Sequence, residues 1–156
     1  MRLSICAVGR LKAGPEKVLF DDYLTRLDRT GRALSLGPTA MIEVEDRKGG
    51  GMAAEAMLLR NAVPDGSQIV TMDERGRQMS SPEFAKFLTR IRDDGARDCA
   101  FVIGGADGIA KDLRAEASYS ISFGKMVWPH MLVRVMLAEQ LYRAASILAG
   151  SPYHRA

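Results

Sequence analysis

Strand-like and helix-like segments alternate along the whole chain, and this alternation limits the possible folds more than any other feature. Five short runs rich in Ile, Val, Leu and Phe have the length of buried strands. They span residues 2–8, 40–44, 68–72, 99–103 and 119–123. The segments between and after them place apolar residues at helical spacing and span about 15–29, 52–63, 81–95, 110–117 and 131–148. The pattern predicts an α/β fold with an open, mainly parallel sheet of about five strands and helices on both faces.

The composition is that of an ordinary globular protein, with 47% apolar and 26% charged residues in a chain of 156. We therefore expect a single domain over residues 1–156. No stretch approaches the roughly 20 apolar residues that span a bilayer, and the first residues do not form a secretory signal, so we expect a cytoplasmic protein. Cys6 and Cys99 lie in strand-like runs and are predicted to be buried free thiols rather than a disulfide.

Glycine-containing segments follow three of the predicted strands, at residues 73–77, 104–108 and 124–130. In an open parallel sheet, ligands bind at the carboxyl ends of the strands. The segment Gly104-Gly105-Ala106-Asp107-Gly108 is either a tight turn or a ligand loop, and it lacks the G-x-G-x-x-G dinucleotide spacing. The 123–130 segment has few ligand-type side chains. It is either an ordinary strand-to-helix connection or a loop whose backbone holds a flat heteroaromatic group such as adenine.

Several kinds of site find no support in the sequence. Two histidines and two strand cysteines give no metal-ligand spacing, so we expect no metal. No G-x-S-x-G nucleophile motif is present, and no constrained carboxylate pair points to hydrolysis. His130 is interpreted as a helix cap or packing residue, and the Ser80-Ser81-Pro82-Glu83 segment as a strong helix start.

The C-terminal segment 123–156 concentrates unusual residues and charge. It holds both histidines, the only tryptophan, and a charge of +4 − 1 = +3, which equals the net charge of the whole chain. An anionic partner is therefore most readily bound here. The helix at 131–148 is apolar nearly all round, which predicts that its second face packs on another subunit. Glu139 and Arg143 are spaced to pair on that helix.

Tyr153-His154-Arg155, one residue from the end of the chain, are an aromatic, a titratable and a cationic side chain in succession. Chain ends are often disordered. Alternatively, the three side chains contact nucleic acid, because a Tyr ring stacks on an unpaired base, an Arg binds phosphate and a His transfers a proton.

Long motifs of the chain together resemble one family. They are Ile103-Gly104-Gly105-Ala106-Asp107-Gly108, Trp128-Pro129-His130-Met131-Leu132-Val133-Arg134, Ala138-Glu139-Gln140-Leu141-Tyr142-Arg143-Ala144 and Pro152-Tyr153-His154-Arg155. The chain is similar over its whole length to SPOUT-superfamily methyltransferases of the RlmH type, which act on large-subunit ribosomal RNA. The resemblance implies a C-terminal trefoil knot and a homodimer that assembles through the C-terminal helix. It also implies methyl transfer from S-adenosylmethionine to N3 of a pseudouridine in 23S ribosomal RNA, with the assembled 70S ribosome as substrate.

The same resemblance implies the site residues. Those expected at the cofactor are Met72, Gly104, Gly105, Phe123, Gly124, Lys125, Met126, Val127 and Trp128. We expect His154 to assist loss of the N3 proton, Arg155 to stabilise the developing anion or a phosphate, and Tyr153 to stack on RNA. A rival hypothesis is that the tail only positions RNA. Arg134 is expected at the RNA or at the subunit interface.

Two other functions are compatible with the pattern. One is a non-catalytic module that binds RNA or the ribosome, and the other is a flavodoxin-like nucleotide protein. Binding of S-adenosylmethionine separates the enzyme from the first, and the colour of the purified protein tests the second.

Overall fold

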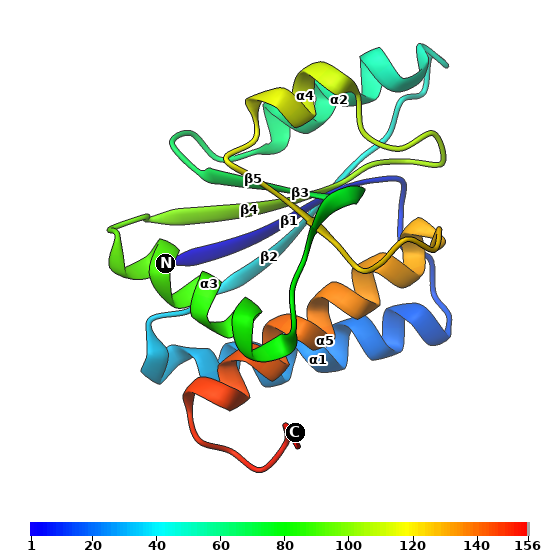
Figure 1. Cartoon of the computed structure of the whole chain (residues 1–156). Helices are drawn as coiled ribbons and strands as arrows, with labels where there is room; N and C mark the ends of the chain where they lie inside the picture. The colour runs from blue at the N-terminus through cyan, green and yellow to red at the C-terminus, as the bar shows by residue number, and fades with distance from the viewer. Residues whose placement is uncertain (156) are drawn as a thin grey trace.

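The computed structural model describes residues 1–155, in which five parallel strands form one sheet. In sheet order the strands are β2 (Thr39–Val44), β1 (Arg2–Val8), β4 (Asp98–Ile103), β3 (Gln68–Gln78) and β5 (Tyr119–Ser122). Every neighbouring pair is parallel, so all carboxyl ends meet at one edge, on the right in Figure 1. The predicted α/β class and open parallel sheet are confirmed.

Helices cover both faces of the sheet. They are α1 (Pro15–Gly31), the 3-10 helix η1 (Arg32–Leu34), α2 (Gly51–Ala62), α3 (Ser81–Asp93), α4 (Lys111–Glu116) and α5 (His130–Leu148). Figure 1 shows α1, α3 and α5 on one face and α2 and α4 on the other. The predicted start of α3 is confirmed, because Ser80 and Glu83 form a reciprocal capping box.

Strand β3 is longer than predicted. Residues 73–77 were expected to be a loop, but after a register shift beyond Met72, Arg77 and Gln78 pair with Ile121 and Ser122 of β5. Gly76 permits this close approach, since a Cβ there would lie 2.6 Å from the backbone nitrogen of Ile121. The sequence does not indicate this part of the strand, because its residues are charged and its pairing partner lies more than 40 residues away.

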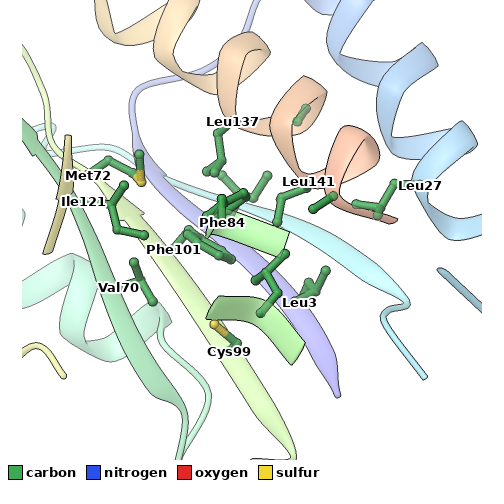
Figure 2. Packing of buried hydrophobic residues seen from close by; sticks show 14 of the residues in the cluster. Leu3, Leu27, Val70, Met72, Phe84, Cys99, Phe101, Ile121, Leu137 and Leu141 are labelled. Atoms are coloured by element: carbon green, nitrogen blue, oxygen red, sulfur yellow. The ribbon is translucent and has the colours of Figure 1, made fainter. Parts of the chain in front are cut away.

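The main core lies between the sheet and the α1, α3 and α5 layer. Strand β4 is buried at every residue, as expected for the central strand of a parallel sheet. Figure 2 shows Leu137 and Leu141 of α5 pointing toward Phe101 of β4. Phe84 of α3 meets Phe101 edge-on, with ring centroids 6.2 Å apart. This packing fixes α5 on the face of the sheet. The loop before α5 is therefore held at the carboxyl edge.

Helix α5 finds partners for much of its surface within the subunit. It packs against α1, α3 and β4, and Leu137, Ala138, Leu141, Ala144 and Ala145 have no exposed surface. The all-round apolarity that predicted a second subunit is thus largely explained by two flanking helices. Apolar surface remains nearby at Leu132, Val18 and Leu19, which are 39%, 69% and 48% exposed.

Candidate cofactor and substrate site

A cavity of about 660 Å³ lies at the carboxyl ends of β4 and β5 and beside the irregular part of β3 that follows Met72. Its position is the one expected for ligands of open parallel sheets. Eight residues predicted at the cofactor line it: Met72, Gly104, Gly105, Phe123, Gly124, Met126, Val127 and Trp128. The ninth, Lys125, is exposed on the same loop and does not line the cavity. The sequence therefore predicted residues that the fold brings together from three separate segments.

The turn after β4 is built from close backbone contacts. The amide of Gly108 donates to the carbonyl of Gly105 over 3.0 Å, which closes the turn. A Cβ on Gly104 would lie 2.5 Å from the carbonyl oxygen of Gly108, and one on Gly105 would lie 3.0 Å from the carboxylate oxygens of Glu55. The two interpretations left open from the sequence are thus compatible, because this is a tight turn that also lines the cavity.

The loop between β5 and α5 presents backbone groups and apolar side chains. Ser122 Oγ accepts from the amide of Gly124 over 3.0 Å and donates to its carbonyl over 2.8 Å, which fixes the start of the loop. Met126, Val127 and Trp128 are 73%, 82% and 40% exposed although they are large and apolar. Such side chains beside a cavity suit a flat heteroaromatic ligand.

Charged groups in the cavity wall come partly from residues that the sequence did not single out. Asp73 is almost fully buried and pairs with Arg75 at 3.1 Å and with Arg114 at 3.7 Å. Behind Gly105, burial raises the pKa of Glu55 above its ordinary value, and the carboxylate of Asp107 raises it further. Asp73 and Arg75 belong to the 73–77 segment named from the sequence, whereas Arg114 and Glu55 were missed because they reach this wall only through contacts between distant segments.

His130 is the first residue of α5 and also lines the cavity, although the sequence indicated only a capping or packing role. Its Nδ1 is buried without a hydrogen-bond partner among the described residues. Burial lowers the pKa of the imidazole, and the neighbouring Arg134 guanidinium lowers it further, which favours the neutral ring.

Arg134 lies in the interior, not on the surface that was predicted. Its Nη2 donates to the carbonyl oxygens of Val8 at 2.5 Å and Gly9 at 2.9 Å, and its Nη1 pairs with Glu43 at 3.0 Å. A side chain with 0% exposure has no surface to offer to RNA or to a second subunit. The expected substrate contact is therefore corrected: Arg134 ties the first turns of α5 to the ends of β1 and β2.

The C-terminal tail folds back on the last part of α5. The hydroxyl of Tyr153 and Nε of Arg143 both donate to Oε1 of Glu139 over 2.9 Å, and the predicted pairing of Arg143 with Glu139 is confirmed. The Arg143 guanidinium lies 4.7 Å from the Tyr153 ring centroid, and its Nη1 is 3.4 Å from Nδ1 of His154. Arg155 is exposed. These residues form an ordered network rather than a free end.

The tail lies along the second half of α5, whereas the cavity lies at its first residue, His130. Glu139 and Arg143, which contact Tyr153 and His154, are about 14 and 20 Å from His130 along the helix at 1.5 Å per residue. Within one subunit the structure therefore does not bring Tyr153, His154 and Arg155 to the residues that line the cavity.

A second groove, of about 530 Å³, lies between α1, α5 and the start of α3. It shares Ile121, Phe123 and Gly124 with the first cavity. Leu19 and Tyr23 of α1 face Val135 and Met136 of α5 across it. Its walls combine apolar surface with the side chains of Glu139 and Gln140. Glu139 binds Tyr153 and Arg143, and Gln140 donates a hydrogen bond to Glu139.

Within residues 1–155, no group of three or more His, Cys, Asp and Glu side chains is arranged to hold a metal ion. In the same part of the chain, no helix is both long enough and apolar enough to cross a membrane.

Comparison with known proteins places the chain among methyltransferases. The family described as predicted SPOUT methyltransferases matches residues 1–154. The chain is 70% identical over 155 residues to a Ruegeria pomeroyi protein named "Ribosomal RNA large subunit methyltransferase H", with 99% of each chain covered. A Roseobacter denitrificans protein of the same name is 69% identical over the same share. A solved probable methylase family protein from Haemophilus influenzae has a TM-score of 0.52 and 12% identity, over 99% of this chain and 70% of that one.

Proposed function

The chain belongs to the SPOUT methyltransferase family, and on that basis we propose that it methylates N3 of a pseudouridine in large-subunit (23S) ribosomal RNA. It is a methyltransferase that uses S-adenosylmethionine as the methyl donor. The name of relatives that are 70% and 69% identical over their full length supports ribosomal RNA as the substrate. The atom and the base follow from the resemblance of the C-terminal motifs. The assembled 70S ribosome in the cytoplasm and the trefoil knot belong to the same proposal.

The observation that carries the proposal is the cavity at the ends of β4 and β5 and beside the irregular part of β3, whose walls fit S-adenosylmethionine. Its volume of about 660 Å³ is within the range of roughly 300–1,000 Å³ for small-molecule sites. The glycine turn at 104–105 lets a ligand approach the backbone, and the apolar loop at 126–128 can cover an adenine ring. The residues proposed to hold the cofactor are Met72, Gly104, Gly105, Phe123, Gly124, Lys125, Met126, Val127 and Trp128.

The chain's own residues have three tasks in this reaction. Bound S-adenosylmethionine supplies a methyl group that its positively charged sulfur has already activated. The cavity walls align this group with N3 and exclude water. The imidazole of His154 accepts the N3 proton at Nδ1 after this nitrogen leaves Nη1 of Arg143, which lies 3.4 Å away in the folded-back tail. Arg155 stabilises the developing anion or a phosphate, and Tyr153 stacks on RNA.

A homodimer brings these parts together. Because the tail of one subunit is held along the second half of α5, away from the cavity at the first turn, the tail that serves a cavity comes from the partner. The groove between α1 and α5, with exposed Val18 and Leu19 beside it, offers apolar surface for the partner's helices. Glu139 fixes Tyr153 and Arg143 close to this groove, so a tail ordered in this way lies at the subunit boundary.

Methyl transfer to ribosomes tests the proposed function. Purified 70S ribosomes that lack the modification should accept radiolabelled methyl groups, and protein-free ribosomal RNA should accept far fewer. Calorimetry with S-adenosylmethionine runs in parallel. Cofactor binding without transfer to either substrate would contradict the ribosomal substrate, and absence of cofactor binding by folded protein would favour a non-catalytic RNA-binding module.

Mixing two weakly active variants tests the shared site. Gly104→Ala damages the cavity and His154→Ala the tail, so each variant alone should be only weakly active when S-adenosylmethionine is well below saturation. In an equal mixture, half of the dimers carry one intact cavity facing one intact tail, and activity should return to about a quarter of the wild-type value. A mixture no more active than its components, with subunit exchange verified, would show that the tail does not act across the interface.

A further inference from the structure

The carboxyl edge of the sheet is only partly used by the cofactor cavity. The cavity lies over the ends of β4 and β5 and the irregular part of β3 after Met72, while the loops after β1 and β2 occupy the rest of the edge. These two loops, residues 9–14 and 45–50, are called the β1–β2 edge below. They contain Arg10, Lys12, Arg47 and Lys48, all of which are exposed.

The two loops lie side by side. The amide of Gly9 donates to the carbonyl of Val44 over 2.8 Å, and the amide of Leu11 donates to the carboxylate of Glu43. Arg134, which is buried under the two loops, binds the same carboxylate and the carbonyls of Val8 and Gly9. The β1–β2 edge is therefore one continuous surface with a rigid base.

This surface adjoins the cofactor cavity. A Cβ on Gly9 would lie 3.9 Å from Cε1 of His130, and His130 lines the cavity. Beyond the second loop, Glu55 of α2 reaches Gly105 in the cavity wall. In Figure 1 the loops after β1 and β2 and the loop before α5 are all on the right-hand side of the sheet.

The charge of the β1–β2 edge is positive, at +4 − 2 = +2 over its 12 residues. Arg10, Lys12 and Lys48 form no ion pair with another described residue. Arg47 lies 3.7 Å from Glu45, but its side chain is 86% exposed. The carboxylate of Asp46 accepts from the amides of Lys48 and Gly51 over 3.2 and 3.1 Å, so local backbone amides occupy it.

We propose that the β1–β2 edge binds the phosphate backbone of the RNA substrate next to the nucleotide that receives the methyl group. This inference rests on the proposed function. The RNA has to reach the mouth of the cavity, so its flanking phosphates must pass over the neighbouring loops. Four exposed cations on two loops match a chain of phosphates, which long flexible side chains bind without base specificity.

The composition of the surface favours RNA over a membrane. The exposed residues of the two loops are charged, small or glycine, and the large apolar Leu11 is buried. A surface without exposed apolar side chains does not insert into lipid. On the opposite flank of the cavity, Arg75 and Lys125 are also exposed, so the cavity mouth has cations on both sides.

Charge-neutralising variants test the proposal. One variant carries Arg10→Gln and Lys12→Gln, and a second carries Arg47→Gln and Lys48→Gln. The matched control carries Arg90→Gln and Arg97→Gln, which remove the same charge from exposed positions near the amino ends of the strands. All six side chains are exposed, so circular dichroism should show normal folding for each variant.

The readout is binding of unmodified 70S ribosomes at several salt concentrations, together with turnover at saturating ribosome. Each edge variant should raise KM for ribosomes about tenfold at physiological salt and reduce the slope of log affinity against log salt by roughly 1.5, as expected for two lost phosphate contacts. The turnover number and the affinity for S-adenosylmethionine should stay within twofold of wild type. Edge variants that match the control in KM and salt slope would overturn the proposal, as would a loss of binding that does not depend on salt. Failure of the proposed function would differ, because wild-type protein would then not methylate ribosomes.

Discussion

Replacing Gly104 by alanine tests whether the turn after β4 holds the cofactor. The added Cβ would lie 2.5 Å from the carbonyl oxygen of Gly108, 2.6 Å from its carbonyl carbon and 2.9 Å from Cγ1 of Ile109. Favourable contacts between carbon atoms start near roughly 3.5 Å, so the backbone at Gly108 must move by about 1 Å. Since Gly104 and Gly108 both line the cavity, this movement changes its wall.

The expected magnitudes follow from this clash. Overpacking of this kind costs about 1–3 kcal/mol, against a total stability of about 5–15 kcal/mol for a domain. The variant should therefore remain folded, with a melting temperature lower by roughly 2–4 °C for each kcal/mol. A backbone displacement of about 1 Å should weaken binding of S-adenosylmethionine at least tenfold, or about 1.4 kcal/mol. Differential scanning fluorimetry and titration calorimetry measure the two effects.

Gly31→Ala is the matched control, because its Cβ would clash with the carbonyl oxygen of Leu36 in the same way. Gly31 ends α1 and does not line the cavity. Its variant should lose similar thermal stability and bind S-adenosylmethionine like wild type. Wild-type affinity in folded Gly104→Ala protein would refute the role of the turn, and equal loss of affinity in both variants would trace the effect to stability alone.

Three further predictions concern buried and paired groups. Arg134→Met should lower the free energy of unfolding in urea by about 3–5 kcal/mol, because it leaves a carboxylate and two carbonyl groups without their partner, and a change below 1 kcal/mol would contradict this. Cys6 and Cys99 should not react with a thiol reagent at pH 8 until the protein unfolds, because burial raises their pKa to about 11 and about 12, and fast labelling of native protein would be the opposing result. The hydrogen bond from Arg2 lowers the pKa of Asp98 in the folded state, so its contribution to stability is present above about pH 4 and is lost as the pH falls below that value. Asp98→Asn protein should therefore be less stable than wild type at pH 6, and the two stabilities should converge at pH 2. A stability difference that does not change with pH would contradict the pairing of Asp98 with Arg2.

Local patterns in the sequence predict much of the fold because they act over a few residues. The apolar runs give the strands, and the capping box at Ser80 and Glu83 gives the start of α3. The segments that line the cavity follow from glycines placed after strands, because parallel strands bring their carboxyl ends together, whereas the prediction that these residues hold a cofactor comes from the family resemblance. These features depend on spacing along the chain, which the sequence displays directly.

Other features depend on contacts between distant segments, and the sequence does not display them. Arg134 looks like a surface cation, but the chain folds so that three acceptors from β1 and β2 surround it. The end of β3 looks like a charged loop, yet it pairs with β5. The tail looks like a free end, although Glu139 and Arg143 hold Tyr153 against the second half of α5, away from the cavity.

The most direct test of the proposed reaction is mass spectrometry of ribosomal RNA after incubation with the protein. Unmodified 70S ribosomes are treated with S-adenosylmethionine and wild-type or Gly104→Ala protein, and the 23S RNA is digested to fragments and nucleosides. One fragment of the large-subunit RNA should gain a single methyl group, on N3 of a pseudouridine, with wild type and only weakly with the variant. A methyl group on another base or on small-subunit RNA, or no gain with protein that binds S-adenosylmethionine, would contradict the proposed reaction.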